Sequence, residues 1–428
     1  MLVEFSVENF LSIKEKVTLN MLASSGKENP DNLIELVDVP TLKGEKLLKS
    51  AAIYGANASG KTNFLRAIEF VDTIVRKSHE FQSMDKILDK ISETTLSNFK
   101  RFKLDESCLD LPAKFNIIFV QNNIKYEYGF SLDEEKIIEE YLYYYPKGYK
   151  TIIFKRTKTN KFKFTQDIQE QETLSKRTSE NKLYLSVASQ WNFEKVKKAY
   201  NGITDLLNFI DFKGYKQFSA DRIQENLEFK NNFLKYLKKA DFDIDDIQTI
   251  TSPDKSLRSL LVGLSGESKE NSNKKVFTYH YGMDRNNNKI PVEFSLDEES
   301  KGTQEFFGFL GILLKGLQWG AIFVVDEIES SLHPSLVKNI IELFHNTEIN
   351  KKNAQLIFTT HETNLLSLDL MRRDQIWFTE RKEDKSTDLY CLDEFSPRLD
   401  ENIQKGYLNG RYGAIPFLGD WSLLCPEE

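Results

Sequence analysis

Gly55-Ala56-Asn57-Ala58-Ser59-Gly60-Lys61-Thr62 decides the fold of this chain, because the stretch has the form G-x-x-x-x-G-K-T. Residues 47–54 before it predict a short buried strand, and residues 63–71 after it have the apolar spacing of a helix. A glycine loop between a strand and a helix wraps a phosphate with backbone N–H groups, and the helix N-terminus adds partial positive charge. The stretch therefore predicts a phosphate-binding loop, the P-loop.

The residues of the P-loop have separate expected roles in binding ATP. Lys61 is expected to reach the β- and γ-phosphates and to take part in catalysis, while Thr62 is expected to hold Mg²⁺. The other nucleotide-binding positions are expected to be Gly55, Ala56, Asn57, Ala58, Ser59, Gly60 and Asn63. The alternative is a chance match in a glycine-containing turn, and the strand and helix patterns on either side argue against it.

Composition limits the class of protein. The 428 residues include 58 basic and 65 acidic side chains, and the net charge of −7 argues against a uniformly basic nucleic-acid binder. This charge does not exclude a local basic groove. Cys108, Cys391 and Cys425 lack zinc-ligand spacing and imply no disulfide framework, which fits a reducing cytoplasm. The N-terminus has no signal-peptide pattern. The apolar stretch 306–325 is interrupted by polar residues and predicts a buried helix followed by a strand, not a membrane span.

Residues 1–162 are expected to form an N-terminal lobe that contains the P-loop and a β subdomain. Residues 1–23 alternate between apolar and polar types, which predicts a half-buried strand pair. Residues 114–120 and 125–130 predict a hairpin that turns at Asn122-Asn123. Residues 64–90 predict a helix.

Residues 163–275 are expected to be a mainly helical insertion, and residues 276–428 a C-terminal lobe. The clearest helices of the insertion are predicted at 191–212 and 222–240, and the polar stretch 265–275 predicts a loop. The lysines of the insertion make it a candidate for contact with a partner or with DNA, although such lysines more often form a solvated face.

Two carboxylates follow the apolar run Ala321-Ile322-Phe323-Val324-Val325. A buried parallel strand would deliver Asp326 to a Mg²⁺ site at its C-terminal end. Glu327 is placed one residue later to orient or deprotonate the attacking water. The alternative is an ordinary strand that ends in surface acids, and the P-loop upstream argues against it.

Residues 355–360 predict another buried strand, which leads into His361. We expect this strand to lie between the Asp326 strand and the P-loop strand, where His361 can bind a γ-phosphate or the attacking water; a satisfied core histidine is the alternative. Residues 330–334 predict a short turn toward a partner subunit. His333 in that turn is more readily explained as a structural histidine than as a metal ligand, because it lacks companion ligands nearby.

A further phosphate site is predicted where Ser300, Lys301 and Gly302 precede an apolar helix. A helix that opens on a serine and a glycine resembles the P-loop physically, and a second chain would present it in trans. Leu264-Ser265-Gly266-Glu267 is a competing match by letters, but no helix pattern follows it.

These five segments, in this order, resemble the core of ABC-type ATPases. The matching positions are 55–62 for Walker A, 300–302 for the signature, 326–327 for Walker B, 331–334 for the D-loop and His361 for the switch histidine. The N-terminal strand pair with residues 8–12 resembles the RecF, SMC and OLD branch. Residues 372–378 and 411–416 are similar to the RloA and abortive-infection ATPases of bacterial phage defence, with AriA and PtuA as further relatives by architecture.

The resemblance implies an α/β fold of P-loop ABC-ATPase type, with a mixed sheet core, an N-terminal antiparallel β subdomain and a helical insertion. It also implies a cytoplasmic homodimer that encloses two ATP molecules and controls a separate effector, often a nuclease. The sequence departs from the ABC-type ATPase pattern in two respects. Lys301 replaces the first signature glycine, and no glutamine can be assigned as the Q-loop. The alternatives are a RecF-like DNA-binding ATPase in repair and an ABC transporter ATPase, which the long insert between P-loop and signature disfavours.

Overall fold

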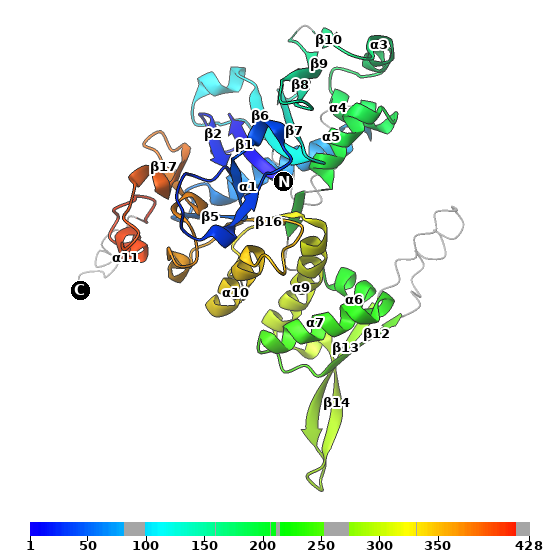
Figure 1. Cartoon of the computed structure of the whole chain (residues 1–428), viewed down its shortest axis with the longest axis vertical. Coiled ribbons are helices and arrows are strands. Elements are labelled where there is room, and N and C mark those ends of the chain that lie inside the picture. Colours follow the sequence, from blue (N-terminus) through cyan, green and yellow to red (C-terminus); the bar gives the residue numbers. More distant parts are fainter. Residues whose placement is uncertain are drawn as a thin grey trace, which may run out of the picture. The chain divides into compact units, whose positions relative to one another are not determined.

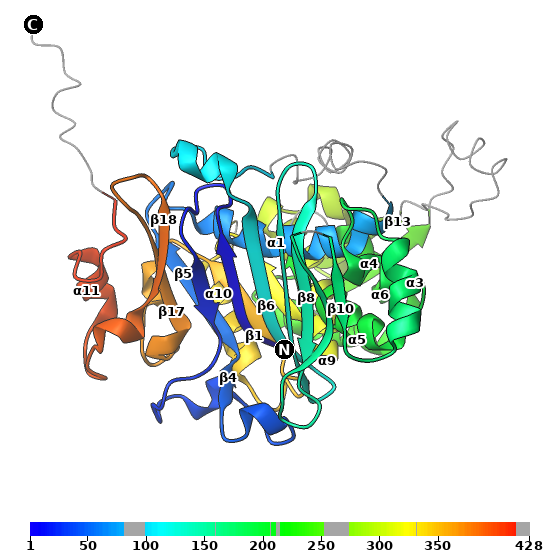
Figure 2. The same ribbon diagram turned by 90° about the horizontal axis from the view of Figure 1, so that it is seen from above.

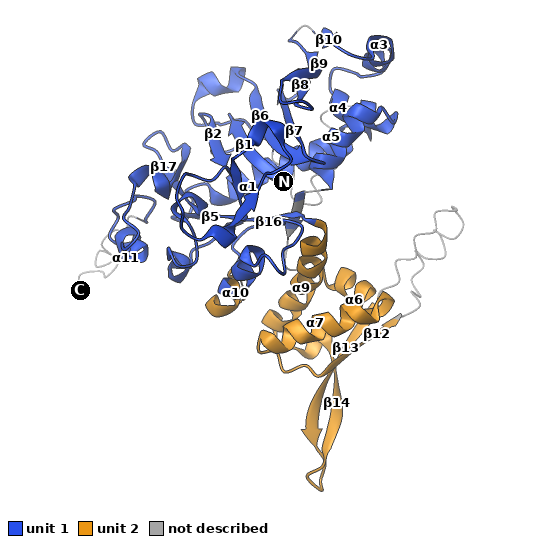
Figure 3. Cartoon of the chain, in the orientation of Figure 1, with its two compact units in different colours: residues 1–209, 320–328, 338–428 blue, residues 210–319, 329–337 orange. Residues whose placement is uncertain are grey.

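The computed structural model describes residues 1–80, 99–158, 160–205, 207–210, 215–251, 274–330 and 332–416 (Figure 1). The chain forms two compact units (Figure 3). Unit 1 contains residues 1–209, 320–328 and 338–428, and unit 2 contains residues 210–319 and 329–337. The expected divisions after residues 162 and 275 therefore differ from the divisions between the units. The reason is that residues 168–204 bury apolar side chains in the core of unit 1.

A six-stranded sheet forms the centre of unit 1, in the order β11-β15-β16-β5-β17-β18. Its strands are β5 (Ser50–Gly55), β11 (Leu207–Ile210), β15 (Ile322–Val325), β16 (Gln355–Thr359), β17 (Ile376–Arg381) and β18 (Thr387–Cys391). Strand β16 pairs in parallel with both β15 and β5, as predicted for the strand before His361. Every residue of β5, β15 and β16 is buried, which is typical of a parallel sheet covered on both faces.

The predicted helix at 191–212 is wrong over its C-terminal part. Helix α5 (Glu194–Thr204) ends early, and the chain then enters β11 at the edge of the sheet. A short apolar run is compatible with either a strand or a buried helix, so periodicity alone did not separate the two.

An antiparallel sheet forms the N-terminal β subdomain, in the order β10-β9-β8-β7-β6-β1-β2. Its strands are β1 (Leu2–Glu8), β2 (Val17–Asn20), β6 (Ala113–Gln121), β7 (Ile124–Leu132), β8 (Ile137–Tyr144), β9 (Thr151–Arg156) and β10 (Phe162–Phe164). The predicted turn between β6 and β7 is confirmed, since Asn122 and Asn123 both have positive φ, at 50° and 60°. A two-residue hairpin loop favours this conformation because its twist matches the strands.

One face of the antiparallel sheet packs on α1 (Lys61–Lys77), the helix after the P-loop. Phe5 of β1 lies 5.7 Å from Phe64 of α1, and Phe115 of β6 lies 5.1 Å from Phe70, measured between ring centroids. In Figure 2 the strands lie in front of α1. The sheet therefore backs the helix that begins at the phosphate loop.

The other elements of unit 1 are shorter. They are β3 (Leu33–Glu35), β4 (Lys46–Leu48), α3 (Ile168–Lys176), α4 (Tyr184–Gln190), α11 (Ile403–Leu408) and the 3₁₀ turns Pro30–Asn32, Pro40–Leu42, Ser78–Glu80, Glu106–Asp110, Thr363–Leu365, Arg373–Gln375 and Leu392–Phe395. Helix α10 (Pro334–His345) begins in unit 2 and ends in unit 1. The helix predicted at 64–90 is confirmed up to residue 77, and residues 81–90 lie outside the described ranges.

Unit 2 packs helices against a three-stranded sheet, β12-β13-β14. Its elements are α6 (Lys216–Glu225), α7 (Leu227–Lys239), β12 (Asp246–Thr251), β13 (Lys274–Met283), β14 (Lys289–Ser295), the 3₁₀ turn Leu296–Glu298 and α9 (Lys301–Trp319). Helices α6 and α9 pack closely, and Ser219 Oγ of α6 donates to the Gly308 carbonyl of α9 at 3.1 Å. Gly311 permits this approach, because a Cβ there would collide with Ser219. Within the described parts of the chain, no helix is long and apolar enough to cross a membrane.

Candidate nucleotide-binding site

The P-loop joins β5 to α1 as the sequence predicts. Ala58 and Gly60 have φ of 61° and 109°, a conformation that turns backbone N–H groups inward to form an anion-binding concavity. At the first and last glycines of the loop there is no room for a side chain. A Cβ on Gly55 would collide with Thr379 Oγ1, and a Cβ on Gly60 would collide with Thr387 Oγ1.

Lys61 folds back over the loop. Its Nζ donates to the carbonyl oxygens of Gly55 and Ala56 at 2.8 and 3.0 Å, and the residue is only 6% exposed. The ammonium thus lies beside the backbone that would surround a phosphate, where a P-loop lysine reaches the β- and γ-phosphates. Phosphate oxygens are stronger acceptors for this ammonium than neutral carbonyls, because the hydrogen bond then joins two charged groups.

Asp326 and Thr62 meet at the C-terminal ends of the parallel strands. Thr62 Oγ1 donates to Asp326 Oδ2 at 2.8 Å, although the two residues are 264 positions apart. Hard oxygen donors of this kind fit Mg²⁺, which proteins commonly hold through one carboxylate together with substrate phosphates and water. Among the described residues there is no group of three His, Cys, Asp or Glu side chains that could hold a metal alone. Bound Mg²⁺ would therefore rely on Thr62, Asp326 and nucleotide oxygens.

Thr359, the last residue of β16, connects both carboxylate positions and was missed by the sequence reasoning. Its Oγ1 donates to Asp326 Oδ1 at 2.5 Å and accepts from the Glu327 N–H at 2.7 Å. The side chain is fully buried. Glu327 has a left-handed φ of 46°, which is uncommon for a residue with a long side chain. The available signal was a hydroxyl directly after the apolar run Leu356-Ile357-Phe358.

Glu327 and His361 lie at the same edge of the sheet. Glu327 comes two residues after β15 ends, and His361 comes two residues after β16 ends. Both residues are exposed. Because β16 lies between β15 and β5, the structure brings the P-loop, Asp326, Glu327 and His361 to one edge of the sheet.

Residues far from the P-loop in sequence support its outer side, and sequence reasoning missed them too. Ser59 Oγ lies 2.7 Å from Thr379 Oγ1, and the Ser59 carbonyl accepts from Thr387 Oγ1 at 2.9 Å. Ser12 Oγ lies 2.8 Å from Thr387 Oγ1 and accepts from Asn63 Nδ2 at 2.8 Å. Ser59 is therefore occupied by structural contacts, and the loop is held between β17, β18 and the turn after β1.

Two predicted residues cap helices in unit 2. Ser300 Oγ accepts from the Thr303 N–H at 3.1 Å, so this exposed serine is the N-cap of α9. The side chain of Lys301 is 76% exposed. His333 Nδ1 accepts from the Ser335 N–H at 3.2 Å at the start of α10, which agrees with a structural histidine. Ser331 and the competing segment 264–267 lie outside the described residues.

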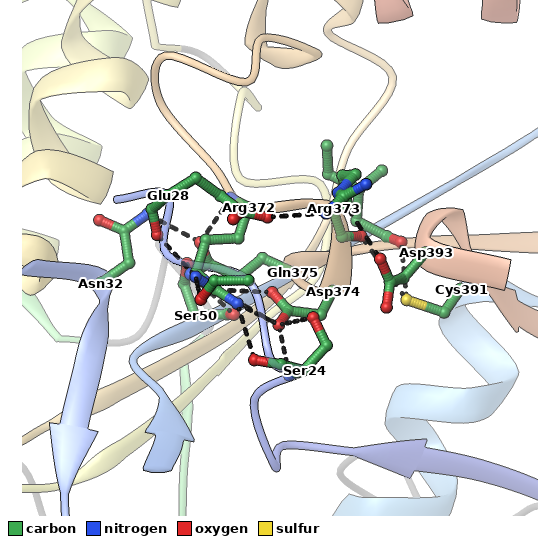
Figure 4. Close-up of polar contacts among 12 residues, drawn as sticks. Ser24, Glu28, Asn32, Ser50, Arg372, Arg373, Asp374, Gln375, Cys391 and Asp393 are labelled. Atoms are coloured by element: carbon green, nitrogen blue, oxygen red, sulfur yellow. Dashed lines mark hydrogen bonds and ion pairs between the residues drawn. The ribbon is translucent and has the colours of Figure 1, made fainter. Parts of the chain in front are cut away.

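Arg372, Asp374 and Gln375 form a buried polar network at the start of β17, and the half-buried Arg373 lies beside them (Figure 4). Arg372 is fully buried and donates to the carbonyl oxygens of Glu28 and Gly26 at 2.6 and 3.1 Å. Its Nε donates to Asp374 Oδ1 at 2.9 Å, and Asp374 accepts from the Ser24 N–H at 2.7 Å. The segment thus fastens residues 24–28 to the start of β17, which is a structural function.

Gln375 extends this network to β5. Its Nε2 donates to Ser50 Oγ at 2.8 Å, and its Oε1 accepts from Asn32 Nδ2 at 2.7 Å. Ser50 Oγ also lies 2.8 Å from His345 Nε2. Burial lowers the pKa of His345 to about 3, so the ring stays neutral in this cluster.

A family model described as "AAA domain, putative AbiEii toxin, Type IV TA system" matches residues 50–367, about three quarters of the chain. The chain belongs to this AAA-domain family. The matched span of the family runs from β5 through the P-loop and Asp326 to the segment after His361. The fold is that of a P-loop ATPase of ABC type, with the mixed central sheet and the antiparallel N-terminal sheet described above.

Several solved structures are similar to this member of the family at low sequence identity. The SMC head domain from Thermotoga maritima is 12% identical, with 91% of this chain and 98% of that chain covered and a TM-score of 0.38. A Smc head domain with an extended coiled coil, bound to the C-terminal domain of ScpA and derived from Pyrococcus furiosus, is 13% identical, covering 92% and 97%, with a TM-score of 0.39. A Smc head domain with a coiled coil and joint derived from Pyrococcus yayanosii is 11% identical, covering 96% and 99%, with a TM-score of 0.41. No curated protein matches the sequence.

Proposed function

We propose that this chain binds ATP with Mg²⁺ and hydrolyses the β–γ phosphoric anhydride bond. The observation that carries the proposal is the contact of Thr62 with Asp326 beside the P-loop, because it joins the expected phosphate site to the expected metal site. A buried P-loop lysine and an exposed acid one residue after Asp326 add two more of the groups that phosphoryl transfer to water uses.

Each group has a defined task in the proposed reaction. The P-loop N–H groups and Lys61 hold the β- and γ-phosphates. Thr62 and Asp326 would hold Mg²⁺, which would supply positive charge to the phosphate oxygens. Glu327 accepts a hydrogen bond from the attacking water and draws its proton as the oxygen approaches phosphorus. His361 donates a hydrogen bond to the γ-phosphate or to that water.

Hydrolysis is proposed to need a homodimer. Ser300 caps the N-terminus of α9, and the backbone N–H groups behind it form an anion site of the same physical type as the P-loop. A second copy would present Ser300, Lys301 and Gly302 to the γ-phosphate held by the first. Two ATP molecules would then lie between two copies of the chain.

The biological role is proposed to be control of a separate effector, a nuclease, in bacterial anti-phage defence in the cytoplasm. The family description supports this role, since it names a putative AbiEii toxin and a type IV toxin–antitoxin system. The resemblance of residues 372–378 and 411–416 to the RloA and abortive-infection ATPases points the same way.

The Glu327→Gln variant tests the proposal. It is expected to bind ATP and Mg²⁺, to lose at least 100-fold of turnover as general-base catalysis is removed (a loss on the order of 10²–10⁴) and to accumulate as a dimer with ATP. Turnover is measured by phosphate release, and mass by light scattering after size exclusion. Glu348→Gln, which changes an exposed acid in the connection between α10 and β16, is the matched control.

Unchanged turnover in Glu327→Gln would remove that residue from catalysis, and a mass insensitive to ATP would refute the dimer.

The RecF-like alternative is tested by a separate measurement of DNA binding. If the protein bound duplex DNA with an affinity that falls steeply with salt, repair-type DNA binding would be favoured over effector control.

A further inference from the structure

Three consecutive acids, Asp297-Glu298-Glu299, come directly before the start of α9 in unit 2 (Figure 3). The start of this helix is the proposed anion site for the γ-phosphate held by a second copy. A carboxylate is stabilised near the N-terminus of a helix by the partial positive charge there, so a nearby acid competes with a phosphate for the same place. The proposed site can therefore bind a phosphate only if these carboxylates are held elsewhere.

Two backbone N–H groups at the start of α9 are available to an anion. Ser300 Oγ accepts from the Thr303 N–H at 3.1 Å, which uses the third N–H group of the helix. The N–H groups of Lys301 and Gly302 have no acceptor among the residues that the structure describes. The first N–H groups of a helix have no partner within the helix, so their acceptor must come from outside it.

Two of the three acids are kept from this position by simple means. Glu298 Oε2 accepts from the Ser295 N–H at 2.7 Å, so its carboxylate caps the 3₁₀ turn that precedes α9. Asp297 is exposed to solvent, which screens its charge. Glu299 is the acid next to Ser300, and its carboxylate is the one that most needs to be held.

Strand β13 holds the carboxylate of Glu299. Its Oε1 accepts from His280 Nε2 at 2.7 Å and from Thr278 Oγ1 at 2.5 Å. An ionised carboxylate only accepts, so the shared hydrogen lies on the ring nitrogen of His280. The two donors are two positions apart in one strand and thus project from the same face of the sheet. The side chain of Glu299 is only 13% exposed.

The surroundings of this contact are also fixed in place. The Glu299 carbonyl accepts from Gln304 Nε2 at 2.8 Å, and Gln304 Oε1 accepts from Lys216 Nζ at 2.6 Å. The ring of His280 lies edge-on to Phe294, with 5.1 Å between ring centroids and 87° between ring planes. Both the acid and its histidine donor therefore have defined positions beside the start of α9.

We propose that His280 is a positioning residue, which holds the Glu299 carboxylate on β13 and thereby keeps the start of α9 open to the γ-phosphate of a second copy. The inference rests on the proposed ATP-dependent dimer. Without the imidazole N–H, the Thr278 hydroxyl alone binds the carboxylate. The released side chain then turns toward the N–H groups of Lys301 and Gly302, where its charge opposes the incoming phosphate.

The test measures the dissociation constant of the dimer by light scattering over a dilution series, with saturating ATP and Mg²⁺. All variants are made in full-length Glu327→Gln protein, in which the ATP-bound dimer is expected to accumulate. His280→Phe keeps a ring beside Phe294 and removes the N–H donor. We expect its dimer to be at least about tenfold weaker, because like charges across an interface oppose association. Its affinity for ATP as a monomer is expected to be unchanged, since the P-loop belongs to unit 1.

A second substitution separates positioning from a purely structural contribution of His280. Adding Glu299→Gln to His280→Phe is expected to restore the dimer to within about twofold of the parent, because a neutral amide does not repel a phosphate. Adding Asp297→Asn is the matched control, since it removes one charge from the same turn and is expected to leave the defect in place. Any loss of packing at His280 is common to both double variants.

Three results would overturn the inference. They are a dimer of unchanged affinity in His280→Phe, failure of Glu299→Gln to restore it, and equal restoration by Asp297→Asn. A parent protein that stays monomeric with ATP would refute the proposed dimer, and the inference with it, before any substitution at His280 is measured. The thermal midpoint from circular dichroism verifies that each variant is folded.

Discussion

The hydroxyl of Thr359 is predicted to be essential for turnover. The Thr359→Val substitution keeps the size of the side chain and removes the donor to Asp326 Oδ1 and the acceptor for the Glu327 N–H. A hydrogen bond to a charged group contributes about 1.5–3 kcal/mol and a neutral one about 0.5–1.5 kcal/mol, so the pair contributes about 2–4.5 kcal/mol.

The two hydrogen bonds of the Thr359 hydroxyl stabilise the backbone conformation of Glu327. Holding a non-glycine residue at a left-handed φ costs roughly 1–3 kcal/mol, which the two bonds of Thr359 offset in the native protein. Without them, Glu327 is expected to relax and Asp326 to lose its orientation. A loss of about 2–4.5 kcal/mol corresponds to roughly a 30- to 2,000-fold lower turnover number. The KM for ATP is expected to change much less, because Lys61 and the P-loop stay intact.

The assay is steady-state ATP hydrolysis with the purified full-length protein, together with the thermal midpoint from circular dichroism. Thr359→Ser keeps the hydroxyl and is expected to retain most of the turnover. Thr360→Val is the matched control, since the adjacent hydroxyl accepts the Glu362 N–H at 3.0 Å in the capping turn. Turnover within twofold of the unmodified protein in Thr359→Val, or an equal loss in Thr360→Val, would refute the reasoning.

Three other substitutions have directions that follow from the structure. Thr387→Val removes the donor to the Ser59 carbonyl, a hydrogen bond that contributes roughly 0.5–1.5 kcal/mol, and is expected to weaken nucleotide affinity about 2- to 13-fold as measured by calorimetry. Unaltered affinity would show that the P-loop holds its shape alone. Arg372→Met leaves the carboxylate of its network buried and unpaired, so the free energy of unfolding in urea is expected to fall by about 3–5 kcal/mol. Burial raises the pKa of Asp72 to about 6 despite its contact with Arg76, so the folded state holds this proton more tightly than the unfolded state. The contribution of Asp72 to stability therefore falls as pH rises from about 4 to 6, by about 3 kcal/mol. Asp72→Asn should abolish that part of the pH dependence of the thermal midpoint, and parallel pH profiles of the two proteins would contradict the assignment.

Local patterns were sufficient to predict the strands and the loop that form the candidate site. The P-loop, the Asp326 strand and the His361 strand are each encoded within about ten consecutive residues, as an apolar run followed by glycines, acids or a histidine. Parallel strands deliver their C-terminal ends to one edge, so the convergence of these residues also followed from the sequence.

The residues that hold the site in shape could not be predicted in this way. Thr359, Thr379 and Thr387 act through contacts with residues that are distant in sequence, and a threonine in a strand is otherwise unremarkable because its β-branched side chain favours that conformation. Strand β11 was missed for a different reason, since its short apolar run continues the apolar pattern of the preceding helix. The expected boundaries after residues 162 and 275 differ from those of the two units. Helix periodicity shows which face of a helix is buried, but it does not show whether that face packs in the core of unit 1 or of unit 2.

The contact between Ser12 and Thr387 has a consequence for synthesis. These residues are 375 positions apart, and together they close the outer side of the loop that carries Ser59. On a ribosome the P-loop emerges well before the β17–β18 hairpin, which follows it in the chain. A nascent chain therefore carries its phosphate loop without the Thr387 contacts until β18 has been made, and we expect it to bind nucleotide more weakly up to that point.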